Sequence, residues 1–367
     1  MNKGFWEKLS KPFFVLAPMA DVTDCAFRKI IAKYSRHGQV GGGPDVFWTE
    51  FVSADGLMSE GREALMRDLA FSEGERPIVA QLFGSTISKM RQASKLCAEL
   101  GFDGIDINMG CPDKKVEKQG AGACMIRTPE TAKEIIQAVK DGINDARKDL
   151  PVSVKTRVGY NKEEIDTWIP FLLDQDISAL TVHLRTRKEM SKVPAHYEYI
   201  PKIIEYRNKI AKDTHIIING DVQDLLHAKS LANKYGCDGA MLGRAIFGNP
   251  WLFDKTKIQR KPIRLPKILY KIIPRSLMKK ILGSKQYTTT VMTLEDRLNV
   301  LVEHAQTFET MLGDIKNFAI MKKHIKAYVH DFKGAKELRV ELMENANSAS
   351  DIKKIVDNFF VQKNNLV

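Results

Sequence analysis

Residues 103–125 read DGIDINMGCPDKKVEKQGAGACM, a stretch that begins as a short strand and ends in a loop holding a cysteine. Ile105 and Ile107 fit a buried apolar strand. The glycine and the proline on either side of Cys111 then force a turn, so this cysteine should project from the strand end. With an unperturbed pKa of about 8.5, it is mostly protonated at neutral pH and can act as a general acid as readily as a nucleophile. Position alone leaves open the alternative of a small buried residue without chemistry.

The rest of the chain repeats the pattern of short β-rich runs with helical segments between them. The eight runs are residues 13–16, 46–49, 78–82, 104–107, 152–155, 179–183, 215–218 and 239–242. Eight strands alternating with helices predict an α/β fold, the (β/α)8 TIM barrel. Polar residues follow nearly every strand, on the face where such barrels build active sites. An open doubly wound sheet is the competing fold, but the Gly-x-Gly-x-x-Gly turn usual near its start is missing.

A smaller all-α domain should follow the barrel. Thr293 and Asp296 form a capping-box pattern, and the apolar residues Leu298, Leu301 and Phe308 then fall on one helix face. The predicted division is a barrel domain at 1–253, a basic insert or linker at 254–292 and a C-terminal helical domain at 293–367.

Composition limits the class of protein. A chain of 367 residues, 44% of them hydrophobic, can bury a large core. Its five cysteines are scattered and never form Cys-x-x-Cys, which argues against a disulfide framework and against a zinc site. The apolar run at 13–16 is too short for a signal peptide, and no stretch reaches the roughly 18 uninterrupted apolar residues of a membrane span. We therefore expect a soluble, cytoplasmic protein without a metal.

Six spaced motifs resemble the tRNA-dihydrouridine synthases, flavoenzymes that reduce uridine to dihydrouridine in tRNA. The motifs are Asn108–Pro112 with Lys115, Val116 and Gly120–Ala123; Ala17–Asp24; Gln81–Gly84; Val154–Gly159; Asn219–Asp221; and Gly243–Arg244. They span roughly residues 12 to 253 in the family's order, and six ordered motifs are far more specific than one. A weaker likeness to the family's helical tRNA-binding domain continues from Met321 to Arg339.

The resemblance implies a flavin site that reduces tRNA. The cofactor would be FMN, reduced by NADPH or NADH, and Cys111 would give a proton to C5 of the uracil while C6 receives a hydride. The implied cofactor-binding residues are Pro18, Met19, Ala20, Gln81, Asn108, Lys155, His183, Asn219, Gly220, Asp221, Gly243 and Arg244. The implied substrate-binding residues are Lys115, Arg185 and Arg187.

Two of these residues raise questions of their own. Lys155 closes a strand and should point its ammonium into the barrel mouth, where it needs a partner such as the reduced flavin. His183 is interpreted as a flavin or substrate contact, with a packed core histidine as the alternative. Leu184 follows it where the family usually has glycine, and the added side chain could alter the approach of the backbone to the ligand.

The net charge of +12 is concentrated in residues 255–285, which hold eleven Lys or Arg and no Asp or Glu. We interpret this segment first as a contact for tRNA phosphates. The alternatives are a helical insert packed on the protein and, less favoured, a membrane-surface helix.

Two other functions compete with tRNA reduction. One is a flavin-dependent pyrimidine dehydrogenase acting on a free base, which has no need of the basic segment or the helical tail. The other is a catalytically silent RNA-binding barrel, which would not require Cys111, Lys155 and Gln81 together.

Overall fold

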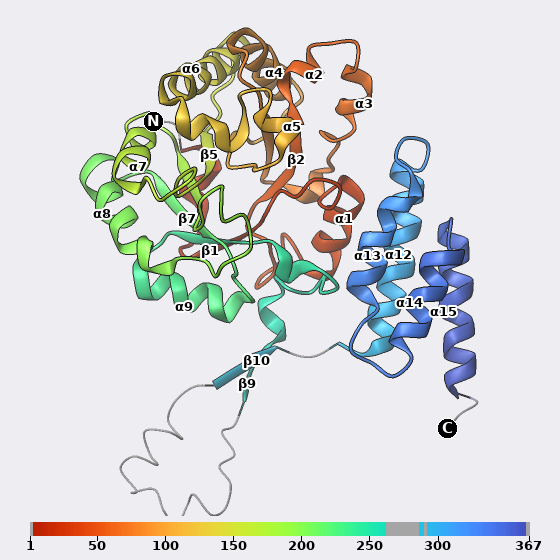
Figure 1. Cartoon of the computed structure of the whole chain (residues 1–367). Coiled ribbons are helices and arrows are strands. Elements are labelled where there is room, and N and C mark those ends of the chain that lie inside the picture. The colour runs from red at the N-terminus through yellow and green to blue at the C-terminus, as the bar shows by residue number, and fades with distance from the viewer. Residues whose placement is uncertain (1–2, 262–285, 290–291, 365–367) are drawn as a thin grey trace, which may run out of the picture.

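The computed structural model describes residues 3–261, 286–289 and 292–364, and in it eight parallel strands form one sheet (Figure 1). The strands are β1 (Phe13–Leu16), β2 (Phe47–Ser53), β3 (Ile78–Phe83), β4 (Gly104–Met109), β5 (Val152–Arg157), β6 (Ala179–His183), β7 (His215–Asn219) and β8 (Gly239–Leu242). Their order in the sheet is β1-β8-β7-β6-β5-β4-β3-β2, so every strand beyond β1 neighbours the next one in sequence. The predicted (β/α)8 barrel is confirmed, although β2 runs four residues further than predicted.

Asp45 bridges the seam between β1 and β2. Its backbone N–H donates to the carbonyl of Phe14 at 2.8 Å, and its carboxylate accepts the N–H of Phe14 at 2.6 Å. These two bonds satisfy backbone groups that a ladder would otherwise pair, and they join β1 to the residues just before β2.

The barrel interior is apolar at the amino ends of the strands. Trp6, in the 3-10 helix η1 (Gly4–Lys8), is fully buried there against Phe13 and Trp48, with ring centroids 5.5 and 6.1 Å away. Further along several strands the interior becomes polar, as Val79 is followed by Gln81 and Ile217 by Asn219 on the same face. The barrel is therefore plugged at one end and polar at the other.

Helices cover the outside of the barrel and build the helical unit beside it (Figure 1). Around the barrel lie α1 (Cys25–Tyr34), α2 (Ala54–Leu57), α3 (Arg62–Met66), α4 (Ile87–Glu99), α5 (Lys114–Glu117), α6 (Pro129–Asp145), α7 (Ile165–Leu173), α8 (Ile200–Ile210) and α9 (Leu225–Tyr235). The helical unit contains α12 (Leu294–Leu312), α13 (Met321–Tyr328), α14 (Ala335–Asn345) and α15 (Ala349–Asn364). In the described part of the chain, no helix combines the length and the apolar character needed to cross a membrane.

The helical unit shares a hydrophobic core with the barrel. Helix α12 begins with the predicted capping box between Thr293 and Asp296, which is confirmed. Cys25, Ala26 and Ile30 of α1 belong to the same buried cluster as α12 to α15, so the unit is seated on α1. Along the chain, the barrel and the helical unit are separated by an antiparallel pair of strands, β9 (Ile258–Lys261) with β10 (Gln286–Thr289). The segment 262–285, which carries most of the predicted tRNA contact, lies outside the described residues.

Two buried histidines should make the protein sensitive to acid. The rings of His304 and His324 lie 4.4 Å apart in the helical core, without a hydrogen-bond partner for three of their four nitrogens among the described residues. Burial lowers the pKa of His324 to about 3 and that of His304 well below its usual value. Because the unfolded chain, with a pKa near 6.5, binds more protons than the folded one, stability is lost as pH falls from about 6.5 towards 3.

We expect His324 to cost about 1.6 kcal/mol of stability between pH 6.5 and pH 5, and His304 to add to this loss. Urea unfolding followed by circular dichroism at both pH values measures this. His324→Phe should unfold with a shallower dependence on pH, and an unchanged dependence would contradict the assignment.

Candidate active site

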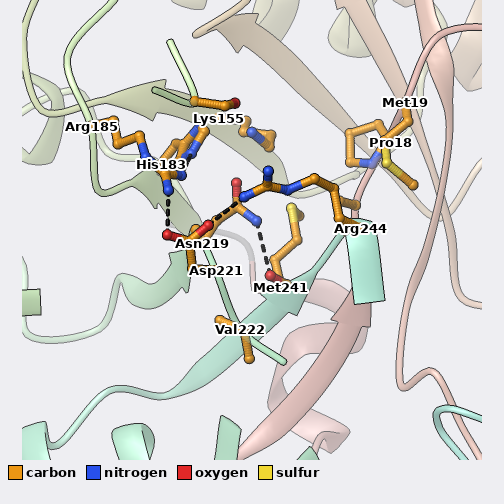
Figure 2. A pocket seen from close by; sticks show the side chains of 14 residues that line it. Pro18, Met19, Lys155, His183, Arg185, Asn219, Asp221, Val222, Met241 and Arg244 are labelled. Carbon is orange, nitrogen blue, oxygen red and sulfur yellow. Dashed lines mark hydrogen bonds and ion pairs between the residues drawn. The ribbon is translucent and has the colours of Figure 1, made fainter. Parts of the chain in front are cut away.

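A cavity of about 260 Å³ opens at the carboxyl ends of the strands (Figure 2). It is lined by Ala17, Pro18, Met19, Lys155, His183, Arg185, Ser191, Asn219, Gly220, Asp221, Val222, Met241, Gly243 and Arg244. Nine of the twelve residues predicted to bind the cofactor are among them. The other three are Ala20, which is exposed, and Gln81 and Asn108, which are buried beside the cysteine loop.

Asp221 organises one end of the cavity. Its carboxylate accepts hydrogen bonds from Arg185, which is buried, and from Arg244, which is largely exposed (Figure 2). The bond from Arg185 holds the pKa of Asp221 below its usual value. Gly220 precedes it with φ +119°, where an added Cβ would lie 3.0 Å from that of Ala195. Arg185 is therefore committed to holding the loop, whereas Arg244 is placed to meet an anion.

His183 lines the cavity as a neutral imidazole that can donate one hydrogen bond. Burial, with Arg157 and Lys155 nearby, lowers its pKa well below the usual value. Its Nε2 lies 3.1 Å from Nη1 of Arg185, and because a guanidinium only donates, Nε2 accepts and Nδ1 carries the proton. The side chain of Leu184 is buried in the core outside the barrel, so it does not narrow the cavity.

Lys155 brings the main positive charge to the cavity wall. Burial, reinforced by Arg157, lowers its pKa to about 8, so it remains mostly charged at neutral pH. Within the described residues, its ammonium has no hydrogen bond or ion pair. A buried cation of this kind is stabilised when an anionic ligand arrives.

A hydrogen-bonded chain leads from the barrel interior to the cysteine loop. Gln81 donates to Asp106 at 2.6 Å and accepts from Asn108 at 3.0 Å. The side-chain oxygen of Asn108 then accepts the backbone N–H groups of Gly110 and Cys111 at 3.1 and 2.9 Å. Each side-chain amide is thus fixed in one orientation, and the turn that presents the cysteine is fixed with it.

Cys111 is half-buried at the end of this chain, against the buried cluster of Phe83, Val116 and Ala121. Burial raises the pKa of its thiol, an effect that Lys155 among others opposes. The thiol is therefore protonated at neutral pH, as the acid role requires.

Two residues of the site were missed by sequence reasoning. Asp106, fully buried, also accepts the hydroxyl of Ser153 at 2.5 Å, and burial raises its pKa to about 6. Arg157 of β5 donates to the carbonyl of Gly110 at 2.7 Å and so holds the cysteine loop against β5. The available signal was the two-residue period of a strand, which places Asp106 on the same face as Asn108 and Arg157 on that of Lys155.

The three predicted substrate-binding residues lie in different settings. Lys115 is exposed on α5, next to the cysteine loop. Arg187 pairs with Glu117 of α5 and lies 5.4 Å from the ring centre of Tyr160, so it ties the loop after β6 to α5. Arg185 is buried in the cavity wall, where it is bonded to Asp221. Of the three, Lys115 is the residue most open to a large substrate.

Comparison with known proteins adds the family. The dihydrouridine synthase (Dus) family profile matches residues 15–364. A probable tRNA-dihydrouridine synthase of Staphylococcus aureus (strain MRSA252) is 40% identical over 365 residues, 99% of this chain and 97% of that protein. A probable tRNA-dihydrouridine synthase 2 of Bacillus subtilis (strain 168) is 38% identical over 361 residues, 98% of this chain and 97% of that protein.

Proposed function

The chain belongs to the dihydrouridine synthase family, and from this premise we propose that it reduces specific uridines in tRNA to 5,6-dihydrouridine. The observation that supports it most is the meeting of a cation-lined cavity and a protonated cysteine at one barrel mouth. Residues 1–253 would form the catalytic domain, 254–292 a basic linker and 293–367 the tRNA-binding domain. A tRNA substrate would place the enzyme in the cytoplasm.

The cavity fits FMN. Arg244 and the backbone amides around Gly220 and Gly243 suit a phosphate, which barrels of this type commonly bind after β7 and β8. Lys155 suits the electron-rich edge of the flavin ring, and Pro18 and Met19 offer a flat wall against it. Bound FMN would supply a hydride to C6 of the uracil after reduction by NADPH or NADH.

Cys111 would complete the reaction by protonating C5 of the uracil. Its raised pKa keeps the proton on the thiol until it is needed, and Asn108 holds the loop in place through two backbone bonds. The target uridine must leave the tRNA stack to reach this site, as base-modifying enzymes generally require. Lys115 would then meet the RNA backbone.

Purification of the protein provides the direct test. It should be yellow and release FMN on denaturation, and deletion of its gene should remove dihydrouridine from at least one tRNA position. A colourless protein, or tRNA that keeps all its dihydrouridine, would contradict the proposal. Turnover of free uracil without turnover of tRNA would favour the free-base dehydrogenase instead.

Lys155→Met should make the bound flavin harder to reduce. The ammonium has no other partner among the described residues, so its loss removes a charge that favours the electron-rich reduced cofactor. We expect the midpoint potential to fall by roughly 30 mV or more, about 1.4 kcal/mol. Potentiometric titration measures it, and Lys89→Met, which changes an outer helix, should leave it unchanged.

A further inference from the structure

An irregularity in β2 turns Glu50 out of the barrel interior. In the ladder between β2 and β3, Trp48 pairs with Val79 and Phe51 with Gln81, so three steps on β2 match two on β3. Such a bulge resets the alternation of side chains. Phe51 takes the inward register of Gln81, and Glu50 is directed instead towards the loop that follows β1.

Glu50 holds that loop by a single backbone bond. Its Oε1 accepts the N–H of Asp21, at the tip of the segment 17–24. The turn is closed around this tip, because Met19 donates to the hydroxyl of Thr23 at 2.9 Å and accepts its N–H at 3.0 Å. Met19 also lines the cavity. A displacement of Asp21 is therefore transmitted to the cavity wall.

The charge of Glu50 is balanced from the helical unit. Lys316, four residues beyond the end of α12, lies 2.7 Å from Oε2 of Glu50 and 2.7 Å from Oδ1 of Asp68. Glu50 is 4% exposed, and burial raises its pKa to about 7 even beside this ammonium. If Lys316 withdraws, the buried Glu50 and the partly exposed Asp68 are left without the cation they share, which is strongly unfavourable for Glu50.

We propose that Glu50 and Lys316 couple the seating of the helical unit to the shape of the cofactor cavity, so that tRNA and flavin strengthen each other's binding. The inference rests on the proposed function, because it assigns tRNA to the helical unit and flavin to the cavity. If tRNA binds more tightly when the helical unit is packed on the barrel, its binding favours the ion pair between Lys316 and Glu50. Glu50 then holds the loop 17–24 in its cavity-lining position. Linkage requires the reverse effect to be equally large.

The same interface provides a matched control. Lys33 of α1 binds Glu303 of α12 at 2.7 Å, so this pair also joins the barrel to the helical unit. Both side chains are much more exposed than Glu50, and neither contacts the loop 17–24. Lys33→Met therefore removes an ion pair from the interface without touching the connection to the cavity.

The test measures FMN affinity by quenching of FMN fluorescence, with and without a saturating unmodified tRNA transcript. In the native protein, tRNA should tighten FMN binding by about 5-fold or more, the usual lower range for coupled sites. Lys316→Met should lower this factor by at least half, since the pair of Lys323 with Asp21, 3.0 Å apart, then remains as the link from the helical unit to the loop. Lys316→Arg, which keeps the cation, should largely restore the factor. Lys33→Met should retain the native factor.

Two results would overturn the inference: a factor of one in the native protein that binds both ligands, or a native factor in Lys316→Met. Failure of the native protein to bind FMN would instead remove the proposed function, and the coupling with it. If Lys316→Met melts below the assay temperature, the nearly isosteric Glu50→Gln replaces it, with the same loss of the factor expected.

Discussion

Replacing Cys111 by alanine should lower dihydrouridine formation by about 10²- to 10⁴-fold, the range typical of a positioned general acid. The flavin should stay bound, because the cysteine does not line the cavity. It should also remain reducible by NADPH, since that step does not use the thiol. Mass spectrometry of tRNA nucleosides measures the first effect, and rapid absorbance measurements of flavin reduction measure the second.

Cys124→Ala is the matched control. Cys124 is likewise half-buried and lies in the 3-10 helix η3 (Gly122–Arg127), next to the residue whose N–H donates to the carbonyl of Cys111. Its loss should leave tRNA turnover nearly unchanged. Loss of the flavin from Cys111→Ala, or normal turnover by it, would contradict the acid role.

The strands could be predicted because each is short, apolar and bounded by turn residues. Strand β2 was the exception, since its polar residues Thr49 and Glu50 look like the end of a strand in sequence. In the structure they form the bulge, and Thr49 stays paired because its hydroxyl accepts the N–H of Gln81 at 3.1 Å. The alternation of side chains along a strand predicts where a regular strand runs, but it does not predict a bulge that interrupts the alternation.

The cavity was more predictable than the groups that support it. Motif residues such as Lys155 and Asn219 stand at or near the carboxyl ends of strands, and parallel strands bring these ends together. Arg185 was predicted to contact substrate, but its partner Asp221 lies 36 residues away in sequence. The ion pair between Arg185 and Asp221 forms only in the tertiary fold, so no local sequence pattern predicts it.

The same limit applies to the leucine that replaces glycine after β6. From the sequence, the added side chain was expected to alter the approach of the backbone to the ligand. In the structure Leu184 donates its backbone N–H to Asn219 at 3.0 Å and packs its side chain into the outer core. The side-chain amide of Asn219 donates to the carbonyl of Met241 at 2.9 Å, so the loop after β6 is joined to β7 by a backbone bond and to β8 through the Asn219 side chain.

Asp106→Leu should be the most damaging change among residues that touch neither ligand in the proposed mechanism. The carboxylate accepts from Gln81 and from Ser153, and both donors would be left buried and unpaired. Each orphaned donor costs about 1–3 kcal/mol, and Gln81 would lose the bond that fixes its amide. Because Asn108 and the cysteine turn depend on that amide, we expect turnover of tRNA to fall roughly 10- to 100-fold.

Asp106→Asn separates orientation from charge. The amide oxygen can still accept from Gln81, and the hydroxyl of Ser153 can turn to accept from the new NH2 group, since a hydroxyl serves in both roles. Turnover should therefore stay within about 5-fold of the native rate, well above that of Asp106→Leu. Steady-state kinetics with unmodified tRNA, on variants shown by thermal melting to be folded, give both values. Equal damage from the two substitutions would mean that the negative charge near Lys155 matters, and that the orientation of the amide chain does not.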